Sequence, residues 1–296
     1  MNTPLAAQKS WGWRIATYLF LAGLGSGSTW VGIVYGLLFR PSTFVTKVGL
    51  LVGPPCVLLG CFFLFFDLGR PSLSYLILRR PKASWIARGF FILSGFILLG
   101  WVLILFWIGP WPVIRDWSSP WIILGCLTGV FALLTSIYPA FLLGCSPIPL
   151  WNTPILPVLF LVSSASMGIS AIVLWTVHVL GLSSQEVSFL VHSDAFLIIL
   201  ELFLLFLYFR GIGPSGAAKV SARKILTEGS APLFWGGVIL VGLVIPFILE
   251  LTGESTLLPG VSVLIGGYLL RCVIVLGGIK VPLSVHGVIL PIPGKN

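Results

Sequence analysis

The chain is divided into long apolar runs, and this pattern restricts the fold more than any other feature of the sequence. The first run, residues 15–39, contains no charged side chain. A helix needs roughly 20 predominantly apolar residues to cross the hydrocarbon layer of a bilayer. We therefore predict eight membrane-spanning helices, at residues 13–38, 48–66, 86–109, 118–143, 153–180, 189–209, 232–251 and 258–278.

The composition excludes a soluble fold. Charged residues make up 8% of the chain and hydrophobic residues 57%, whereas a typical soluble domain carries about 25% charged residues. So little charge cannot cover a surface that faces water. The sequence therefore predicts an all-α, polytopic integral membrane protein that crosses the lipid bilayer several times.

Prolines and polar residues divide the spans into groups. Residues 117–185 carry no charge, and the segment CSPIPLWNTP at residues 145–154 separates two helices within them, because clustered prolines stop helices. We predict a first four-helix bundle in residues 1–150 and a second in residues 151–296. The longest polar connection, residues 210–229, is expected to be a loop between the first six helices and the last two.

The most polar part of the sequence is residues 67–89, DLGRPSLSYLILRRPKASWIARG, which we call the basic segment. Asp67 opens it, and its basic residues are Arg70, Arg79, Arg80, Lys82 and Arg88. Thirteen Lys and Arg residues lie on the side that holds this segment and both termini, and three lie on the other side, with Arg271 left out. Cytoplasmic loops are enriched in Lys and Arg, so we predict that both termini and the basic segment are cytoplasmic. The basic residues lie in short loops between apolar runs, so the net charge of +9 is explained by membrane topology and does not indicate nucleic-acid binding.

Several ionisable side chains lie inside the predicted spans or at their ends. Each costs about 2.5–3.5 kcal/mol on insertion scales and is by default a functional candidate. They are Asp67, Asp194, Glu201, Glu250 and Arg271. Because Glu201 and Arg271 lie deep in their spans, we expect them to pair, either as a structural lock or as part of a proton route with Asp194. Glu250 and Glu254 close the seventh span and are expected to be solvated.

Two tyrosines and one acid are predicted at similar depth on the cytoplasmic side. Tyr18 is early in the first span, Tyr138 is late in the fourth, and Asp67 ends the second. A phenol in an apolar wall can donate one hydrogen bond to a carbonyl oxygen, as a quinone headgroup requires. The alternatives are that the tyrosines belong to the membrane-interface belt, and that Asp67 forms an interfacial ion pair with Arg14 or Arg70.

The cysteines and histidines do not form the ligand sets of common redox centres. None of the five cysteines makes a CxxC pair, so the chain lacks the thiolate ligands of an iron–sulfur cluster. Among the histidines, only His178 and His192 are predicted on the same side near span ends, which favours haem weakly. We expect no metal site, haem or iron–sulfur cluster in this chain.

The sequence resembles the NrfD/PsrC-like membrane subunits of the polysulfide reductase group over nearly its whole length. Five segments in the same order carry the resemblance: YLFLAGLGSGS at 18–28, DLGRP and SWIARG within 67–89, YPAFLL at 138–143, PLWNTPILPVLFLVSS at 149–164 and GGYLLRCVIVLGG at 266–278. The resemblance implies eight or more helices in two bundles, no cofactor bound by the chain itself, and a quinone site in the first bundle.

The resemblance also implies roles for single residues and for partners. Tyr138 matches a tyrosine of the family's quinone site, and Asp67 matches an acid at the end of the second helix. The chain departs from the family pattern at Tyr18, which stands in the place of a histidine, and at Ile15, which stands in the place of an asparagine. The implied partner is a ferredoxin-like iron–sulfur subunit docked on the basic segment and connected to a molybdopterin-type catalytic subunit. Family members with exported partners place this segment outside, whereas the Lys and Arg count predicts it inside here.

The leading hypothesis is a quinone-reactive membrane anchor of a multi-subunit oxidoreductase in the cytoplasmic membrane. It would exchange electrons between menaquinone or ubiquinone and the partner's nearest iron–sulfur cluster. Tyr18 and Tyr138 would bind the headgroup, and Asp67 would relay protons. The docking surface would consist of Arg79, Arg80, Lys82 and Arg88. The alternatives are a proton- or ion-translocating subunit and a passive anchor without quinone chemistry.

Overall fold

The structure is a computed structural model that describes residues 6–7, 11–39, 44–67, 84–108, 119–182, 185–212, 216–253, 256–280, 284–285 and 288–289. Most of the basic segment lies outside these described residues, including Arg70, Arg79, Arg80 and Lys82. Glu254 also lies outside them.

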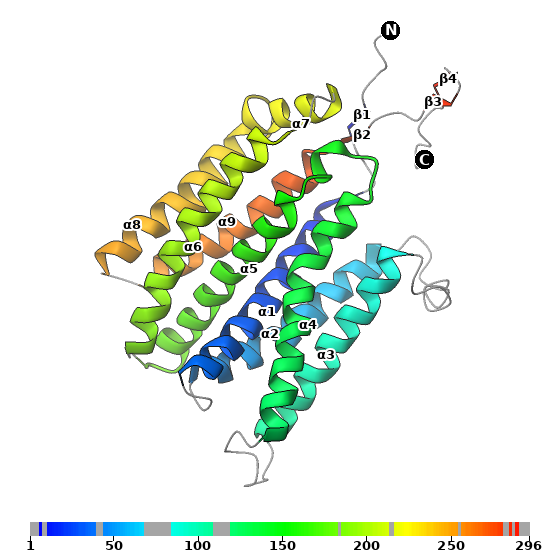
Figure 1. Cartoon of the computed structure of the whole chain (residues 1–296). Coiled ribbons are helices and arrows are strands. Elements are labelled where there is room, and N and C mark those ends of the chain that lie inside the picture. The colour runs from blue at the N-terminus through cyan, green and yellow to red at the C-terminus, as the bar shows by residue number, and fades with distance from the viewer. Residues whose placement is uncertain are drawn as a thin grey trace.

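Helices make up nearly all of the described chain (Figure 1). They are α1 (Trp13–Leu38), α2 (Phe44–Asp67), α3 (Trp85–Ile108), α4 (Ser119–Gly144), the 3₁₀ turn η3 (Pro149–Trp151), α5 (Ile155–Leu174), the π-helix η4 (Trp175–Val179), α6 (Gln185–Arg210), α7 (Gly216–Leu226), the π-helix η5 (Leu233–Val244), α8 (Ile245–Thr252) and α9 (Leu257–Leu276). Short strands pair as β1 (Ala6–Ala7) with β2 (Ile279–Lys280) and as β3 (Ser284–Val285) with β4 (Val288–Ile289).

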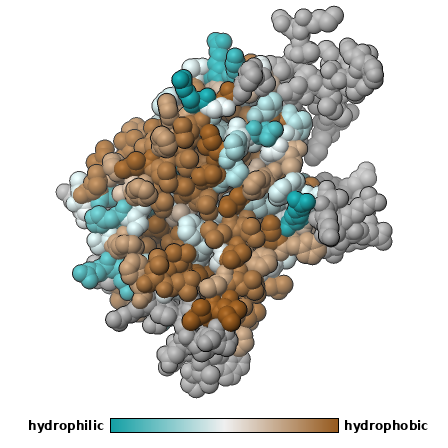
Figure 2. Space-filling model, in the orientation of Figure 1, coloured by the Kyte–Doolittle hydropathy of each residue, from teal (hydrophilic) through white to brown (hydrophobic). Residues whose placement is uncertain are grey.

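Eight helices of the described chain are long and apolar enough to cross a bilayer, which confirms the predicted fold class. Their bounds differ most from the prediction at α2 and α6, which begin at Phe44 and Gln185 rather than at 48 and 189. Hydrophobic side chains cover most of the visible flank, and hydrophilic ones gather toward its ends (Figure 2). The chain is therefore a multi-pass membrane protein.

Strands β1 and β2, one from each terminal part of the described chain, lie together at one end of the helical bundle (Figure 1). β1 pairs antiparallel with β2, with Ala6 opposite Lys280, so the N-terminal segment runs beside the end of α9. We call this end of the bundle the terminal face and the opposite end the distal face. Because successive spans alternate in direction, α2, α4 and α6 end at the terminal face, whereas α8 ends at the distal face.

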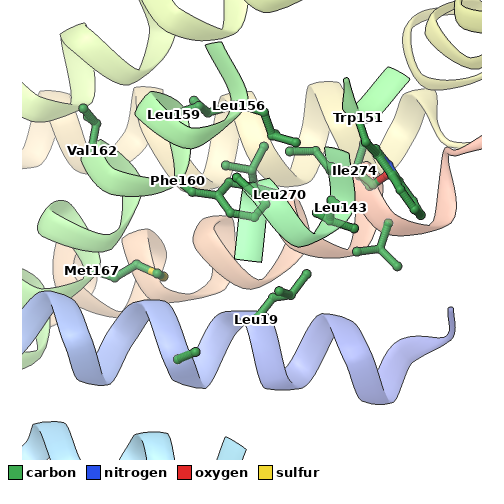
Figure 3. Packing of buried hydrophobic residues seen from close by; sticks show 14 of the residues in the cluster. Leu19, Leu143, Trp151, Leu156, Leu159, Phe160, Val162, Met167, Leu270 and Ile274 are labelled. Atoms are coloured by element: carbon green, nitrogen blue, oxygen red, sulfur yellow. The ribbon is translucent and has the colours of Figure 1, made fainter. Parts of the chain in front are cut away.

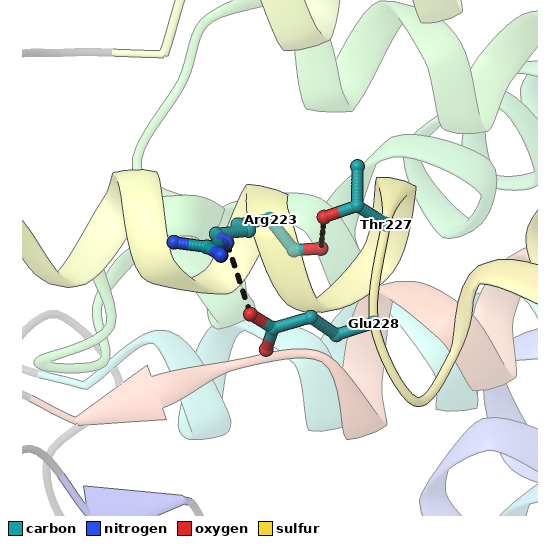
Figure 4. A network of polar contacts seen from close by, with 3 residues as sticks. All are labelled: Arg223, Thr227 and Glu228. Atoms are coloured by element: carbon teal, nitrogen blue, oxygen red, sulfur yellow. Dashed lines mark hydrogen bonds and ion pairs between the residues drawn. The ribbon is translucent and has the colours of Figure 1, made fainter.

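The connection predicted as a loop at residues 210–229 contains the helix α7. One side of α7 is buried, through Ala217, Ala218, Ser221 and Ile225, and their spacing follows the helical period. The loop prediction was wrong because the polar composition hid this narrow apolar face. At the end of the helix, the Arg223 side chain pairs with Glu228 at 3.0 Å, and the Arg223 carbonyl accepts a hydrogen bond from Thr227 Oγ1 at 2.9 Å (Figure 4).

Helix α1 lies at the centre of the packing, against α2 and α4 on one side and α5 and α9 on the other. Small residues permit its close approach to α5. A Cβ at Gly27 would overlap the Ser164 carbonyl, and a Cβ at Gly168 would overlap the backbone of Gly27. Small residues at an interface let two membrane helices approach this closely. Helices α1–α4 and α5–α9 therefore share one interface, while a division at residue 150 stays a prediction.

The largest hydrophobic cluster extends through α1–α7, η5 and α9, and Figure 3 shows its part around α5, α9 and the η3 turn. Trp151 is fully buried there and donates its indole N–H to the Ile274 carbonyl at 2.8 Å. Tyr208 of α6 donates to the Leu150 carbonyl of the same turn at 2.8 Å. The predicted proline-rich break thus folds into a buried turn that hydrogen bonds connect to two neighbouring helices.

Candidate functional site

Tyr18 and Tyr138 lie together in the interior of helices α1–α4. Tyr18 is 1% exposed and Tyr138 is 4% exposed. The two phenols are close enough to interact electrostatically, and the thiol of Cys61 on α2 is within the same range of both. The structure therefore brings together the two phenols that the sequence places at similar depth.

Two glycines let these rings pack against neighbouring helices. The ring of Tyr138 lies against Gly89 of α3, where an added Cβ would overlap the ring and the hydroxyl. Tyr18 contacts Gly60 of α2, where a Cβ would stand 3.5 Å from its ring carbon Cδ2. We call Tyr18, Cys61 and Tyr138, together with these two glycines, the phenol cluster. Cys61 and both glycines are not among the site residues predicted from the sequence, because a small residue in an apolar span carries no chemical signal by itself.

The hydroxyl of Tyr18 is buried and has no hydrogen-bond partner among the described residues. Leaving a buried polar group unpaired costs about 1–3 kcal/mol, and native proteins rarely contain such groups without a reason. A ligand that presents a carbonyl oxygen would supply the missing acceptor. The phenol cluster thus fits the headgroup chemistry expected from the sequence.

A groove between α2 and α3 lies on the lipid-facing flank of the bundle and shares Cys61 with the phenol cluster. It has a volume of about 640 Å³ and is lined by Pro55, Leu58, Leu59, Cys61, Phe62 and Trp101. Leu58, Leu59 and Phe62 are each about half exposed on the flank of the bundle. Cys61 belongs to both the groove and the phenol cluster, so an apolar chain lying in the groove would pass the thiol that interacts with the two phenols.

Asp67 is the last residue of α2 and is partly exposed at the terminal face. It lies six residues beyond Cys61, which is about 9 Å along a helix. Arg14 of α1 donates to the neighbouring Phe66 carbonyl at 3.4 Å, but within the described residues no ion pair joins Arg14 to Asp67. Arg70, the other predicted partner of Asp67, lies outside the described residues.

Arg88 connects the phenol cluster to the terminal surface. It is exposed, and its guanidinium carbon lies 4.8 Å from the centre of the Trp85 ring. Trp85 in turn stacks on Phe141 of α4, with ring centres 5.2 Å apart. Gly89 follows Arg88 in the sequence and packs against Tyr138. A protein bound at Arg88 would therefore lie next to the residue that contacts the phenol cluster.

Glu201 and Arg271 are both buried among helices α5, α6 and α9, but in the part of the chain that the structure describes they do not form a direct ion pair. Arg271 Nη1 donates to Ser163 Oγ at 2.6 Å and to the Gly267 carbonyl at 3.1 Å. Ser163 is also within hydrogen-bonding reach of Glu201. The serine therefore lies between the two charged groups that the sequence predicted to be in contact, and Arg271 extends past it toward Gly23 of α1.

A second buried polar group contains Asp194 of α6 and Glu250 of α8. Asp194 is 1% exposed and Glu250 is 7% exposed. The prediction that Glu250 is solvated was therefore wrong. Glu250 lies within the final turn of α8, and the side chain packs inward between helices instead of reaching past the helix end. Asp194 accepts a hydrogen bond from Ser170 of α5 at 2.8 Å.

The two distal histidines have separate neighbours. His178 Nε2 lies 3.1 Å from Thr256 Oγ1, and His192 Nδ1 lies 2.7 Å from the Ser188 carbonyl of its own helix. Across the described ranges, no group of three or more His, Cys, Asp or Glu side chains is arranged to hold a metal ion.

Comparison with known proteins places the sequence in a family. The sequence model of the family described as "Polysulphide reductase, NrfD" matches residues 2–282. The chain belongs to the NrfD family. It is similar to the C subunit of polysulfide reductase from Wolinella succinogenes, with 33% identity over 294 residues that cover 91% of this sequence and 90% of that protein.

Two other relatives carry the family's own name. Protein NrfD of Escherichia coli is 29% identical over 301 residues, covering 90% of this sequence and 94% of that protein. The NrfD homolog of Haemophilus influenzae is 26% identical over 301 residues, with the same coverage of both proteins. The NrfD match thus extends over both helix groups and confirms the resemblance carried by the five segments.

Proposed function

We propose that this NrfD-family chain is the quinone-reactive membrane subunit of a respiratory oxidoreductase complex. It exchanges electrons between a membrane quinone, menaquinone or ubiquinone, and an iron–sulfur partner subunit. The observation that carries the proposal is the phenol cluster, in which two buried phenols interact with Cys61, a residue that also lines a groove on the lipid-facing flank.

The chemistry of the phenol cluster supports a quinone as the substrate. A phenol donates one hydrogen bond to a carbonyl oxygen, and the Tyr18 hydroxyl lacks any partner within the described residues. The apolar groove suits the isoprenoid tail of a quinone. Quinone reduction takes up protons together with electrons, and Asp67 lies on the terminal side of the cluster, where it relays these protons to water.

The partner and the orientation belong to the same proposal. The NrfD relative from Wolinella is a subunit of polysulfide reductase, so we assign to this protein a ferredoxin-like iron–sulfur partner and, through it, a molybdopterin-type catalytic subunit. We infer that the terminal face is cytoplasmic, because thirteen Lys and Arg residues lie on that side. A phosphatase fused to the C-terminus should therefore be inactive, because it would not reach the periplasm, and an active fusion would reverse the orientation.

The proposal is tested by quinol kinetics on the purified complex carrying Tyr138→Phe or Tyr18→Phe. Each change keeps the ring and removes one donor to the headgroup, a loss of about 1–3 kcal/mol in quinol binding. Quinol-linked turnover should fall while turnover with an artificial dye at the catalytic subunit persists. Tyr35→Phe is the matched control, because Tyr35 is buried in the same helix as Tyr18 but toward the distal face.

Unchanged turnover and quinol affinity in both variants would remove the site from the phenol cluster. A purified complex without any quinol activity would favour the passive-anchor alternative.

A further inference from the structure

Between α5, α6, α8 and α9, near the distal face, lies a small cavity that the phenol cluster does not use. Its volume is about 10 Å³, close to the least that can hold one water molecule. Its polar lining comes from Ser170, Asp194, Glu250 and Thr256. This cavity contains the densest group of buried carboxyl oxygens among the described residues.

The carboxyl groups of Asp194 and Glu250 face each other at this cavity. They are within hydrogen-bonding reach of one another. Among the described residues, however, neither Asp194 Oδ1 nor Glu250 Oε2 has a hydrogen-bond partner. Two ionised carboxylates offer only acceptors, so neither can donate a hydrogen bond to the other unless one carboxyl carries a proton.

No basic side chain of the described ranges neutralises this pair. Glu201, which interacts electrostatically with Asp194, is also acidic. Arg271 instead contacts Ser163 and the Gly267 carbonyl. His178 is held at the distal surface by Thr256. Adjacent carboxylates in a low-dielectric interior cannot both be ionised without a large cost.

We propose that Asp194 and Glu250 form a carboxyl pair that shares one exchangeable proton. The proton supplies the donor that the two unpaired oxygens lack and removes one of two like charges. A divalent metal fits less well, because Ca²⁺ takes six to eight oxygen ligands and Mg²⁺ requires octahedral geometry, and the described residues offer no third acid or histidine.

The cavity connects this pair to the distal side of the membrane. Thr256 lines the cavity and contacts His178, whose ring is exposed at the distal face. In the other direction, Ser170, Ser166 and Ser163 follow one side of α5 and end at the Arg271 guanidinium. A fixed positive charge is a barrier to protons, so the pair exchanges its proton with the distal aqueous phase.

Infrared difference spectroscopy on the full-length protein in lipid nanodiscs tests this proposal. The carbonyl stretch of protonated carboxylic acids shifts when D₂O replaces H₂O, and its intensity counts acid protons. The wild type should exceed the double variant Asp194→Asn/Glu250→Gln by one carboxylic acid per molecule at neutral pH. A difference of zero or of two would overturn the shared proton. The measurement does not depend on quinone chemistry, so it stands apart from the proposed function.

Controls address folding, access and the choice of ion. Glu186→Gln changes an acid at the distal end of α6 outside the cavity and should leave the band unchanged. If the double variant does not fold, the single variants Asp194→Asn and Glu250→Gln are each compared with the wild type by the same carboxylic-acid band. Thr256→Leu should keep the band but slow its exchange into deuterium several-fold, and unchanged exchange would reject entry through the cavity. If NaCl abolishes the band and choline chloride does not, the pair binds sodium, and the proposal that it holds a proton is overturned.

Discussion

The ring of Tyr138 on α4 lies directly against Gly89 on α3, the residue that follows Arg88. This contact positions a buried phenol beside the first turn of α3, where the basic segment ends at the terminal face. It gives the proposed quinone site and the proposed docking surface a common structural element.

Gly89→Ala is expected to disturb the phenol cluster. A Cβ at this position would overlap the Tyr138 ring, and overpacking of this kind costs about 1–3 kcal/mol of stability. Because the ring must move, quinol-linked turnover should fall together with the melting temperature. Gly129→Ala is the control on α4, since its Cβ would make an ordinary contact 3.5 Å from Ile33. Equal behaviour of the two variants would contradict the importance of the contact.

Asp67→Asn is expected to slow quinol turnover without weakening quinol binding. The amide has nearly the shape of the carboxyl but cannot carry a proton, and a positioned acid or base typically contributes about 100-fold or more to rate. Steady-state kinetics should therefore give a lower kcat at an unchanged KM. Glu228→Gln removes a surface acid that pairs with Arg223 and should leave both constants alone. A raised KM in Asp67→Asn would indicate that Asp67 contacts the substrate instead.

Leu59→Trp should narrow the groove between α2 and α3. Leu59 is 50% exposed on the flank and lines the groove, so a larger apolar side chain there is compatible with folding. The KM for a quinol with a long isoprenoid tail should rise, whereas a short-tailed quinol should be affected less. Leu98→Trp, at a lipid-facing position of α3 that is 67% exposed and outside the groove, is the control. Parallel changes for both quinols would rule out the groove as the site of the tail.

Replacing Arg79, Arg80, Lys82 and Arg88 by Gln should weaken assembly with the iron–sulfur partner. Charges at the rim of an interface mainly steer association and make it salt-dependent, so copurification should decrease and become more sensitive to salt. The alternative is that these residues only bind anionic lipid and set the topology. A control with equal charge loss replaces Arg210, Lys219, Arg223 and Lys224 on α6 and α7 of the terminal face. If the first variant inserts correctly and copurifies its partner as the wild type does, the docking role is lost.

The sequence by itself determined the membrane class and the eight spans. Each of these follows from a local property, because a bilayer requires about 20 apolar residues in a row and a backbone that satisfies its own hydrogen bonds. The NrfD family was likewise evident from five short segments. Helix α7 escaped prediction because its buried side consists mainly of alanine and serine within a polar stretch.

Only the tertiary structure decided which side chains meet. Glu201 and Arg271 are at compatible depths in the sequence, yet Ser163 of a third helix lies between them. From the sequence Glu250 is predicted to be solvated at a helix end, but its side chain turns inward toward Asp194. The ring of Tyr138 packs against Gly89 of another helix. The rotation of each helix about its axis and its distance from its neighbours fix these contacts. The rotation and the distance both depend on how small residues pack between helices. The apolar sequence of a single span in lipid does not specify which of its sides faces the protein.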